Sequence, residues 1–343
     1  SKDPGTLGIY GFRKPRAHSY DAMYIATATD VREPRLWDIL SRAGKKVAIL
    51  GVPQTYPVRA VNGWLVADFL TPDTTTQYTY PNSLKVELEQ AIGDYVIDVK
   101  DFRTEDKDGL LKRLYALMEN RFAAARFLLT TKPWEFFMMV EMGMDRLHHG
   151  FWKYADPTHP LYQPGNRFEN VLHDYYQAVD GHIGDLVELA GDDAVVIIVS
   201  DHGAKALHGG VCVNQWLINQ GLLTLRSTPG KPTPIEECAI DWSQTKVWST
   251  GGYYARLFFN VAGREPMGVI PKQEYEPFRN ELIRRIESMP RPDGAPHNNK
   301  AYRPEELYRQ TNGVAPDLIV YFGDLAWRAV GSVGYESIFT PEN

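Results

Sequence analysis

Two pairs of side chains that can bind metal stand out in the sequence. Asp145 and His149 occur in "EMGMDRLHHG", and Asp201 and His202 are adjacent in "AVVIIVSDHG". Residues four apart share one face of a helix, so Asp145 and His149 could grip one ion. By spacing alone, His148 is the competing ligand. A carboxylate with an imidazole suits zinc or manganese, and suits magnesium less well.

Each pair also has an ordinary structural interpretation. Asp145 could cap a surface helix, with His148 and His149 in solvent. Asp201 could bond its own backbone in a turn, with His202 exposed. Considered together, the pairs favour a two-metal centre, which binds the attacking and leaving oxygens of an in-line displacement. Four ligands are too few for two ions, so about two to four further protein ligands are expected.

The elements that must position these pairs are buried strands. The segment 134–141 is predicted to be a strand that leads into a helix beginning near "DRLHHGFWKY". The segment 194–200, "AVVIIVS", is also predicted to be a buried strand, and Gly203 lets the backbone turn after it. Further apolar runs predict strands at 46–53, 63–70 and 315–323.

Amphipathic stretches separate these strands. A helix is predicted from Ser83, its expected N-cap, to a stop at Gly93. A long helix is predicted over 106–130 and another over 166–191. The first of these carries an apolar face made of Leu110, Leu111, Leu114, Leu117 and Met118.

Apolar strands that alternate with helices indicate an α/β fold, with a mostly parallel sheet covered by helices on both faces. In such folds the working residues follow the carboxyl ends of the strands. We therefore expect the segments "EMGMD" and "SDHG" to meet at one edge of one sheet.

Composition excludes several classes of protein. A net charge of −6 argues against a nucleic-acid partner. The two cysteines, Cys212 and Cys238, cannot form a disulfide framework and lack CxxC spacing. No apolar run reaches transmembrane length, and the first residues lack the apolar core of a signal peptide. We therefore expect a cytoplasmic protein without a membrane segment.

The chain resembles the alkaline phosphatase superfamily in its type I phosphodiesterase/nucleotide pyrophosphatase branch, and most closely the group of phosphohydrolases and phosphomutases. "PGTLGIYGF" resembles the PGxHGI segment of that family. "MDRLHHGFWKY" resembles its D-R-x-x-H-x-F-W-R-Y metal motif, which selects His149 over His148. "VSDHG…GGVCVNQWL" resembles the second metal motif, and "GREPMGVI" and "NGVAPDLIVYFGD" resemble downstream segments.

This resemblance implies an alkaline phosphatase-like domain that hydrolyses phosphate mono- or diesters with two divalent ions, zinc or manganese. Asp145 and His149 would bind one ion, and Asp201 and His202 the other. The Thr or Ser nucleophile is expected upstream of Ser1, and a last histidine ligand beyond Asn343. By this resemblance, the printed chain should bind metal weakly and be inactive. We expect one domain over 1–343, truncated at both ends, with candidate cap-like or peripheral insertions at 71–133 and 222–305.

The expected partner is a small phosphorylated substrate. Lys205 and His208, in the loop after the second pair, could contact its phosphate. Three alternatives stay open from the sequence: a phosphomutase, a sulfatase of the same superfamily, and a non-catalytic binding module that retains the fold.

Overall fold

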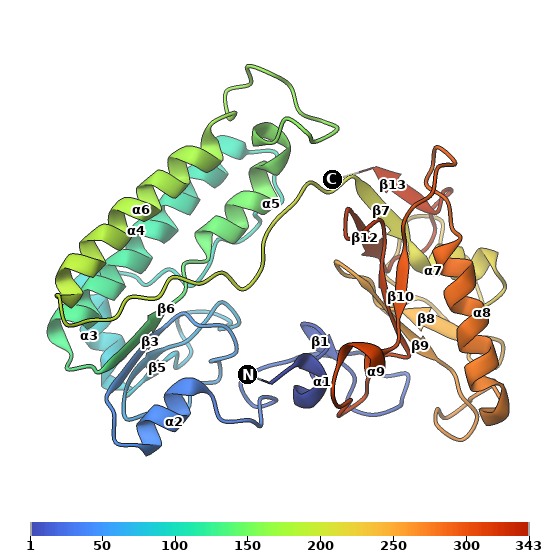
Figure 1. Ribbon diagram of the computed structural model, residues 1–343, viewed down its shortest axis with the longest axis horizontal. Helices are drawn as coiled ribbons and strands as arrows, with labels where there is room; N and C mark the ends of the chain where they lie inside the picture. The colour runs from blue at the N-terminus through green and yellow to red at the C-terminus, as the bar shows by residue number, and fades with distance from the viewer. Residues whose placement is uncertain (1, 342–343) are drawn as a thin grey trace. The chain divides into compact units, whose positions relative to one another are not determined.

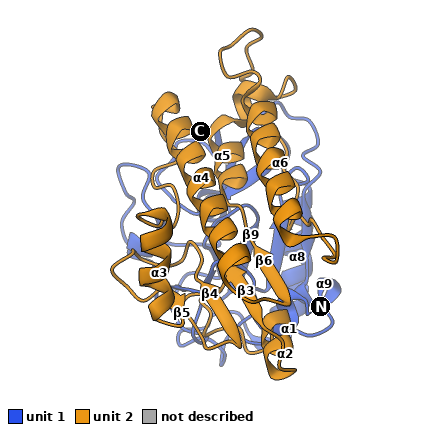
Figure 2. Cartoon of the chain, turned by 90° about the vertical axis from the view of Figure 1, so that its left-hand side faces the viewer, with its two compact units in different colours: residues 1–26, 207–343 blue, residues 27–206 orange. Residues whose placement is uncertain are grey.

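The computed structural model describes residues 2–341, which fold into two compact units. Unit 1 combines residues 1–26 with 207–343, and unit 2 comprises residues 27–206 (Figure 2). A single domain with insertions at 71–133 and 222–305 stays a prediction. Among residues 2–341, the structure contains no helix with the length and apolar character needed to cross a membrane.

Unit 2 is built around a four-stranded sheet (Figure 1). The central strand β3 (Val47–Leu50) lies between β4 (Gly63–Val66) and β6 (Phe136–Met139), and both pairings are parallel. A short antiparallel strand, β5 (Thr79–Tyr80), flanks β4. Every residue of β3 is fully buried because it has a strand on each side. The sequence predictions for these three parallel strands, and for an α/β fold, are confirmed.

Five helices complete unit 2. They are α2 (Leu36–Arg42), α3 (Ser83–Ile92), α4 (Lys107–Thr131), α5 (Gly143–Ala155) and α6 (Val171–Ala190). The long helix α4 starts where Asp106 accepts a hydrogen bond of 3.0 Å from the Gly109 N–H. Its predicted apolar face is buried, except that Leu111 is only partly buried. Helix α3 differs from its prediction at one end, because Asn82 and not Ser83 occupies the N-cap position.

The predicted strand at 194–200 is wrong. No strand is assigned there, and Figure 1 draws this segment as a plain tube after α6. Its five central side chains, Val195–Val199, are 49% to 89% exposed. An apolar, β-branched run encodes a propensity for extended backbone, but a strand also requires a neighbour that accepts its hydrogen bonds. Within residues 2–341, β6 pairs with β3 alone, so its outer edge stays unpaired and the 194–200 run does not join it.

Unit 1 contains two further sheets and one small strand pair. The larger sheet is antiparallel and has the order β10-β11-β9-β8, and β7 forms the centre of a three-stranded sheet between β12 and β13. The strands of unit 1 are β1 (Arg13–Lys14), β2 (Tyr24–Ile25), β7 (Gly209–Cys212), β8 (Val247–Ser249), β9 (Ala255–Phe259), β10 (Lys300–Tyr302), β11 (Leu318–Tyr321), β12 (Trp327–Val330) and β13 (Phe339–Pro341). The predicted strand at 315–323 is thereby confirmed as β11.

The helices of unit 1 are shorter than α4 and α6. They are α1 (Pro4–Leu7), α7 (Val213–Asn219), α8 (Tyr275–Glu287) and α9 (Pro304–Leu307), with single 3₁₀ turns η1 (Ile235–Glu237) and η2 (Lys272–Glu274). Helix α8 buries Leu282 and Ile286 in the main core of this unit. The same core contains the inward-facing residues of β9 and β11, so α8 and the antiparallel sheet stabilise one another.

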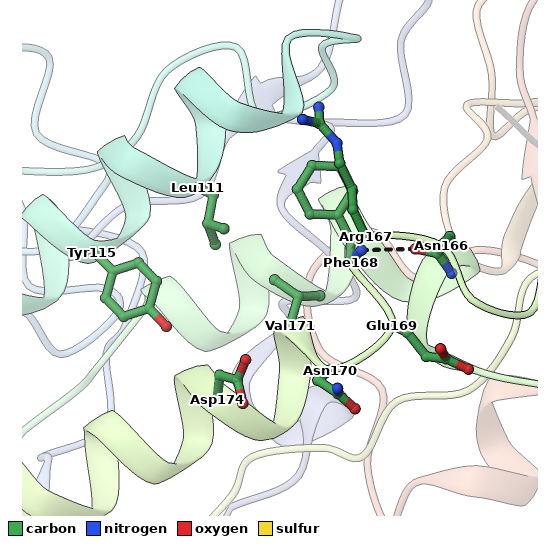
Figure 3. A pocket seen from close by; sticks show the side chains of 9 residues that line it. All are labelled: Leu111, Tyr115, Asn166, Arg167, Phe168, Glu169, Asn170, Val171 and Asp174. Carbon is green, nitrogen blue, oxygen red and sulfur yellow. Dashed lines mark hydrogen bonds between the residues drawn. The ribbon is translucent and has the colours of Figure 1, made fainter.

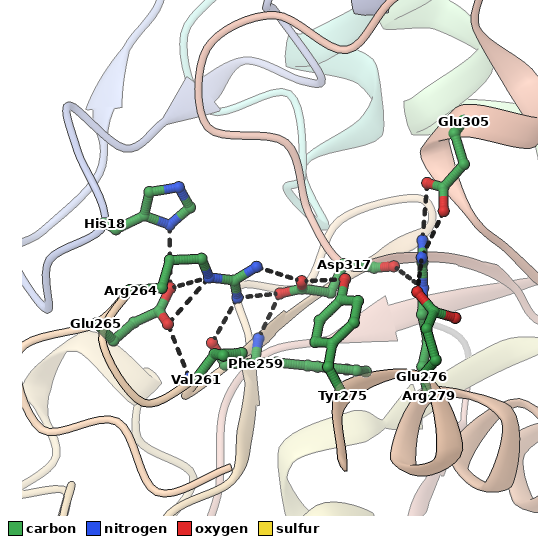
Figure 4. Close-up of polar contacts among 10 residues, drawn as sticks. All are labelled: His18, Phe259, Val261, Arg264, Glu265, Tyr275, Glu276, Arg279, Glu305 and Asp317. Carbon is green, nitrogen blue, oxygen red and sulfur yellow. Dashed lines mark hydrogen bonds and ion pairs between the residues drawn. The ribbon is translucent and has the colours of Figure 1, made fainter. Parts of the chain in front are cut away.

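A network of buried charges holds unit 1 together (Figure 4). The Arg264 guanidinium donates to both carboxylate oxygens of Asp317, at 2.7 and 2.8 Å, and to Glu265 at 2.9 and 3.0 Å. Asp317 also accepts hydrogen bonds from the Tyr275 hydroxyl and the Phe259 N–H. The two downstream segments that carry the family resemblance are therefore joined by one bidentate ion pair.

Candidate metal site

The first turn of α5 follows β6 directly and is tightly packed. The Met144 N–H donates to the Glu141 carboxylate at 2.9 Å, which satisfies one of the free N–H groups at the start of this helix. A Cβ at Gly143 would lie 2.0 Å from the Tyr175 hydroxyl, so only glycine fits there. Asp145 is the acidic residue in this turn, where the helix dipole favours a negative charge.

Asp145 and His149 face one another, as their spacing predicts. The Asp145 Oδ1 atom lies 3.5 Å from His149 Nε2, and both side chains are about three-quarters buried. Burial lowers the pKa of His149, although the neighbouring Asp145 carboxylate acts in the opposite direction. The imidazole is therefore neutral near pH 7, which is the form that binds a metal ion.

His148 is directed toward α6. Its Nε2 atom lies 3.0 Å from the Tyr176 hydroxyl, and its ring packs edge-on against Trp152. Burial lowers the pKa of this histidine as well. Of the two adjacent histidines, His149 is therefore the one that lies beside the Asp145 carboxylate.

The second pair lies just after 194–200, where the chain forms neither helix nor strand, and both of its side chains are largely exposed. His202 Nε2 is 3.6 Å from Asp201 Oδ2 and 3.9 Å from Asp145 Oδ1. His202 Nδ1 lies 2.9 Å from the Gly203 carbonyl oxygen. A proton on Nδ1 makes that bond, and it leaves Nε2 with the lone pair that a metal ion requires.

The pairwise distances suit a divalent cation. Two donors bound to one tetrahedral metal at about 2.1 Å are separated by roughly 3.4 Å, which is close to the spacing of Asp145 and His149. Oxygen and imidazole donors are also the correct types for zinc or manganese. Across the described residues 2–341, however, no three His, Cys, Asp or Glu side chains converge on one point that could hold an ion. The metal-binding side chains approach one another in pairs and do not form a complete ligand set for one ion.

Three polar residues around these pairs were not singled out from the sequence. Glu141 is partly buried, and burial raises its pKa; its Oε1 accepts a hydrogen bond of 3.2 Å from the Tyr175 hydroxyl. Arg146 donates to Asp145 Oδ2 at 2.8 Å and also binds Asp98. The sequence signal for Glu141 is an acidic residue at the end of an apolar strand, whereas Asp98 carries no local signal because it comes from a distant loop.

The two predicted phosphate contacts belong to different units. Lys205 is exposed near the end of unit 2. His208 is exposed in unit 1, where its backbone N–H donates to the Ala326 carbonyl oxygen at 2.8 Å. A role for either side chain in binding substrate stays a prediction.

One cavity of unit 2 contains none of the predicted ligands (Figure 3). It has a volume of about 210 Å³ and lies between α4 and the segment that leads into α6. Its lining includes Tyr115 and Asp174, and at its rim the Phe168 N–H donates to Asn166 Oδ1 at 2.9 Å. The candidate metal site is thus a partly open surface and not part of this cavity.

Comparison with known proteins places the chain in a family. The chain fits the family described as Type I phosphodiesterase / nucleotide pyrophosphatase over residues 1–340. No curated protein and no solved structure matched. The match includes the segments of both Asp/His pairs and of the Arg264–Asp317 network. The chain belongs to the type I phosphodiesterase/nucleotide pyrophosphatase family, and so to a class of hydrolases that cleave phosphodiester or pyrophosphate bonds.

Proposed function

We propose that this chain binds two divalent metal ions, zinc or manganese, and that they serve the hydrolysis of phosphate mono- or diesters in a small substrate. The ligands would be Asp145, His149, Asp201 and His202. One observation carries the proposal: His202 Nε2 lies 3.9 Å from Asp145 Oδ1, although these residues are far apart in the sequence. Family membership supports the class of reaction.

The side chains of this site would contribute in distinct ways. Divalent ions, when bound, supply positive charge that offsets the charge developing on the phosphoryl oxygens. Asp145 and His149 provide a rigid pair on one helix, because both are partly buried and α5 fixes their spacing. Asp201 and His202 provide an exposed pair whose spacing no helix or strand fixes, so it would adjust as an ion binds. Lys205 would add a cation for the substrate phosphate.

Metal binding tests the ligands directly. Mn²⁺ is titrated into the chain, and paramagnetic broadening of the His149 and His202 ring signals is followed by NMR. We expect both rings to broaden at the lowest Mn²⁺ concentrations, and we expect Asp145→Asn and Asp201→Asn to weaken the effect. Asp174→Asn is the matched control, because Asp174 forms another Asp/His pair with His173 at 3.3 Å in the same unit.

Hydrolysis tests the reaction. The full-length protein is stripped of metal and assayed with bis(p-nitrophenyl) phosphate and p-nitrophenyl phosphate after addition of Zn²⁺ or Mn²⁺. The ligand variants should lose the metal-dependent rate, while Asp174→Asn should retain it. Full activity in Asp201→Asn would show that this residue is not a ligand.

A further inference from the structure

Arg146, the residue after Asp145, connects this candidate ligand to a distant loop. Its Nη1 atom donates to Asp145 Oδ2 at 2.8 Å. Its Nε atom donates to both carboxylate oxygens of Asp98 at 3.1 Å, and its Nη2 atom donates to Asp98 Oδ2 at 2.6 Å. One guanidinium therefore bridges two carboxylates. Because the guanidinium is planar, the directions of its N–H groups are fixed relative to one another.

This contact determines which oxygen of Asp145 is available. Oδ2 is occupied by Arg146, and Oδ1 is the atom that lies 3.5 Å from His149 and 3.9 Å from His202. A carboxylate on a free side chain rotates between several orientations. With one oxygen held by the guanidinium, the other is directed toward the two imidazoles.

The guanidinium is itself immobilised. Only 12% of the Arg146 side chain is exposed, and its Cζ atom lies 4.8 Å from the centre of the Phe102 ring and 5.4 Å from that of Phe69. Phe102 also contacts the His149 ring at 5.5 Å. On the far side, Asp98 is anchored by the Val99 N–H, which donates to it at 2.8 Å. The cation is therefore held in place by two aromatic rings and by Asp98.

We infer that Arg146, held by Asp98, is a positioning residue that orients Asp145 for metal binding. The inference rests on the proposed function, because it concerns the metal that Asp145 would bind. Residues that hold a metal ligand in place usually change metal affinity roughly 10- to 100-fold when they are removed. We expect a loss of that size from Arg146→Gln.

The direction of the effect separates positioning from charge. Arg146 is a cation 2.8 Å from a candidate ligand, so its charge alone opposes the binding of a second cation. If charge were its only influence, Arg146→Gln would tighten metal binding. A positioning role predicts weaker binding in Arg146→Gln and also in Arg146→Lys, which keeps the charge and loses the fork.

The experiment measures the Mn²⁺ dissociation constant by EPR of the free ion, for wild type, Arg146→Gln, Arg146→Lys and Asp98→Asn. Unfolding midpoints are recorded for each protein. Arg35→Gln is the matched control, because Arg35 is also 12% exposed and forms an ion pair with Asp38 in the same unit. It should lower stability without changing the dissociation constant.

The outcomes are distinct. Weaker Mn²⁺ binding in all three site variants, with an unchanged constant in Arg35→Gln, supports the inference. Binding that is unchanged or tighter in Arg146→Gln, or of wild-type strength in Arg146→Lys, overturns it. If one variant fails to fold, the other two still decide. Asp145→Asn tests the proposed function separately: if it binds Mn²⁺ as wild type does, Asp145 is not a ligand and the proposed function itself fails.

Discussion

Two clusters of charged side chains, one in each unit, differ in burial and in hydrogen bonding. In unit 1, Asp317 and Glu265 are only 3% exposed, and Asp317 accepts hydrogen bonds from Arg264, Tyr275 and a backbone N–H. In unit 2, Asp145 is 27% exposed and Asp201 is 85% exposed. In this second cluster, the carboxylate oxygens lie 3.5 to 3.9 Å from the imidazole nitrogens of His149 and His202, which is longer than a normal hydrogen bond.

The difference distinguishes charges that stabilise the fold from charges that are available for chemistry. A buried carboxylate whose lone pairs are all satisfied has no capacity for a ligand, and removing its partner leaves an unpaired charge. A partly exposed carboxylate such as Asp145, with one oxygen held by Arg146 and the other directed toward imidazoles, retains that capacity and contributes less to folding. Stability and metal binding should therefore respond to mutations in different clusters.

The largest expected effect on stability comes from Asp317. Replacing it with asparagine leaves Arg264 without its bidentate partner and offers N–H groups where Phe259 and Tyr275 also donate. Breaking a buried ion pair in this way costs about 3 to 5 kcal/mol. We expect that loss in the free energy of unfolding, measured with chemical denaturant.

Glu281→Gln is the control for Asp317→Asn. Glu281 also pairs with two arginines, Arg284 and Arg285, but on the exposed surface of α8. It should shift the unfolding midpoint far less. If both substitutions lowered the free energy of unfolding equally, burial and full hydrogen bonding would not be what makes the Asp317 cluster stabilising.

The next largest effect on stability is expected from His297. It is a buried titratable group of unit 1 whose side chain, unlike those of Asp317 and Glu265, has no hydrogen-bonding partner among the described residues. Among the described residues, neither of its ring nitrogens has a hydrogen-bond partner, and it packs against Trp327, Phe322 and Phe339. Burial, with a smaller contribution from Arg291, lowers its pKa from 6.5 to about 4. The unfolded chain therefore binds a proton that the folded chain excludes.

Stability should fall as pH falls below the unfolded pKa of His297, and this contribution should vanish at higher pH. The expected loss from this group is about 2 kcal/mol between pH 7.5 and pH 5. His297→Phe removes the titration and suits the aromatic surroundings, so it should lose about that much less stability over the same range. Identical pH profiles for the two proteins would show that His297 is not protected from protons in the fold.

The smallest effect on stability is expected from Asp145, in the candidate metal site of unit 2. Asp145→Asn should change the free energy of unfolding by about 1 kcal/mol or less, because the side chain is partly exposed and the asparagine oxygen can still accept the Arg146 hydrogen bond that Oδ2 accepts at 2.8 Å. Added Mn²⁺ should raise the unfolding midpoint of the wild type, since a ligand that binds the folded state stabilises it. It should not raise the midpoint of Asp145→Asn. If Asp145→Asn greatly lowered the free energy of unfolding in the absence of metal, Asp145 would be needed for folding and not only for metal binding.

Two apolar runs show how far sequence alone carries the fold. Residues 47–50 and 195–199 are similar in composition, and both predict a buried strand. The first is fully buried between β4 and β6, and the second is exposed without a partner. Local sequence favours a strand at both places, but pairing depends on which segments reach the same edge.

The candidate site divides in the same way. The spacing of Asp145 and His149 predicts their contact because one helix fixes the geometry. The approach of His202 to Asp145, and the contact of Asp98 with Arg146, join segments that are distant along the chain. No periodicity or local motif encodes such contacts.

The sequence by itself determined the α/β class, the long helices and the parallel strands of unit 2, the two Asp/His pairs and the family. These features depend on patterns within one element or on short motifs, which a chain carries wherever it folds. The tertiary structure decided the rest: that 194–200 is not a strand, that His148 is directed toward Tyr176, and that Arg146 holds Asp145. The physical reason is that each of these outcomes depends on a partner brought close only by folding.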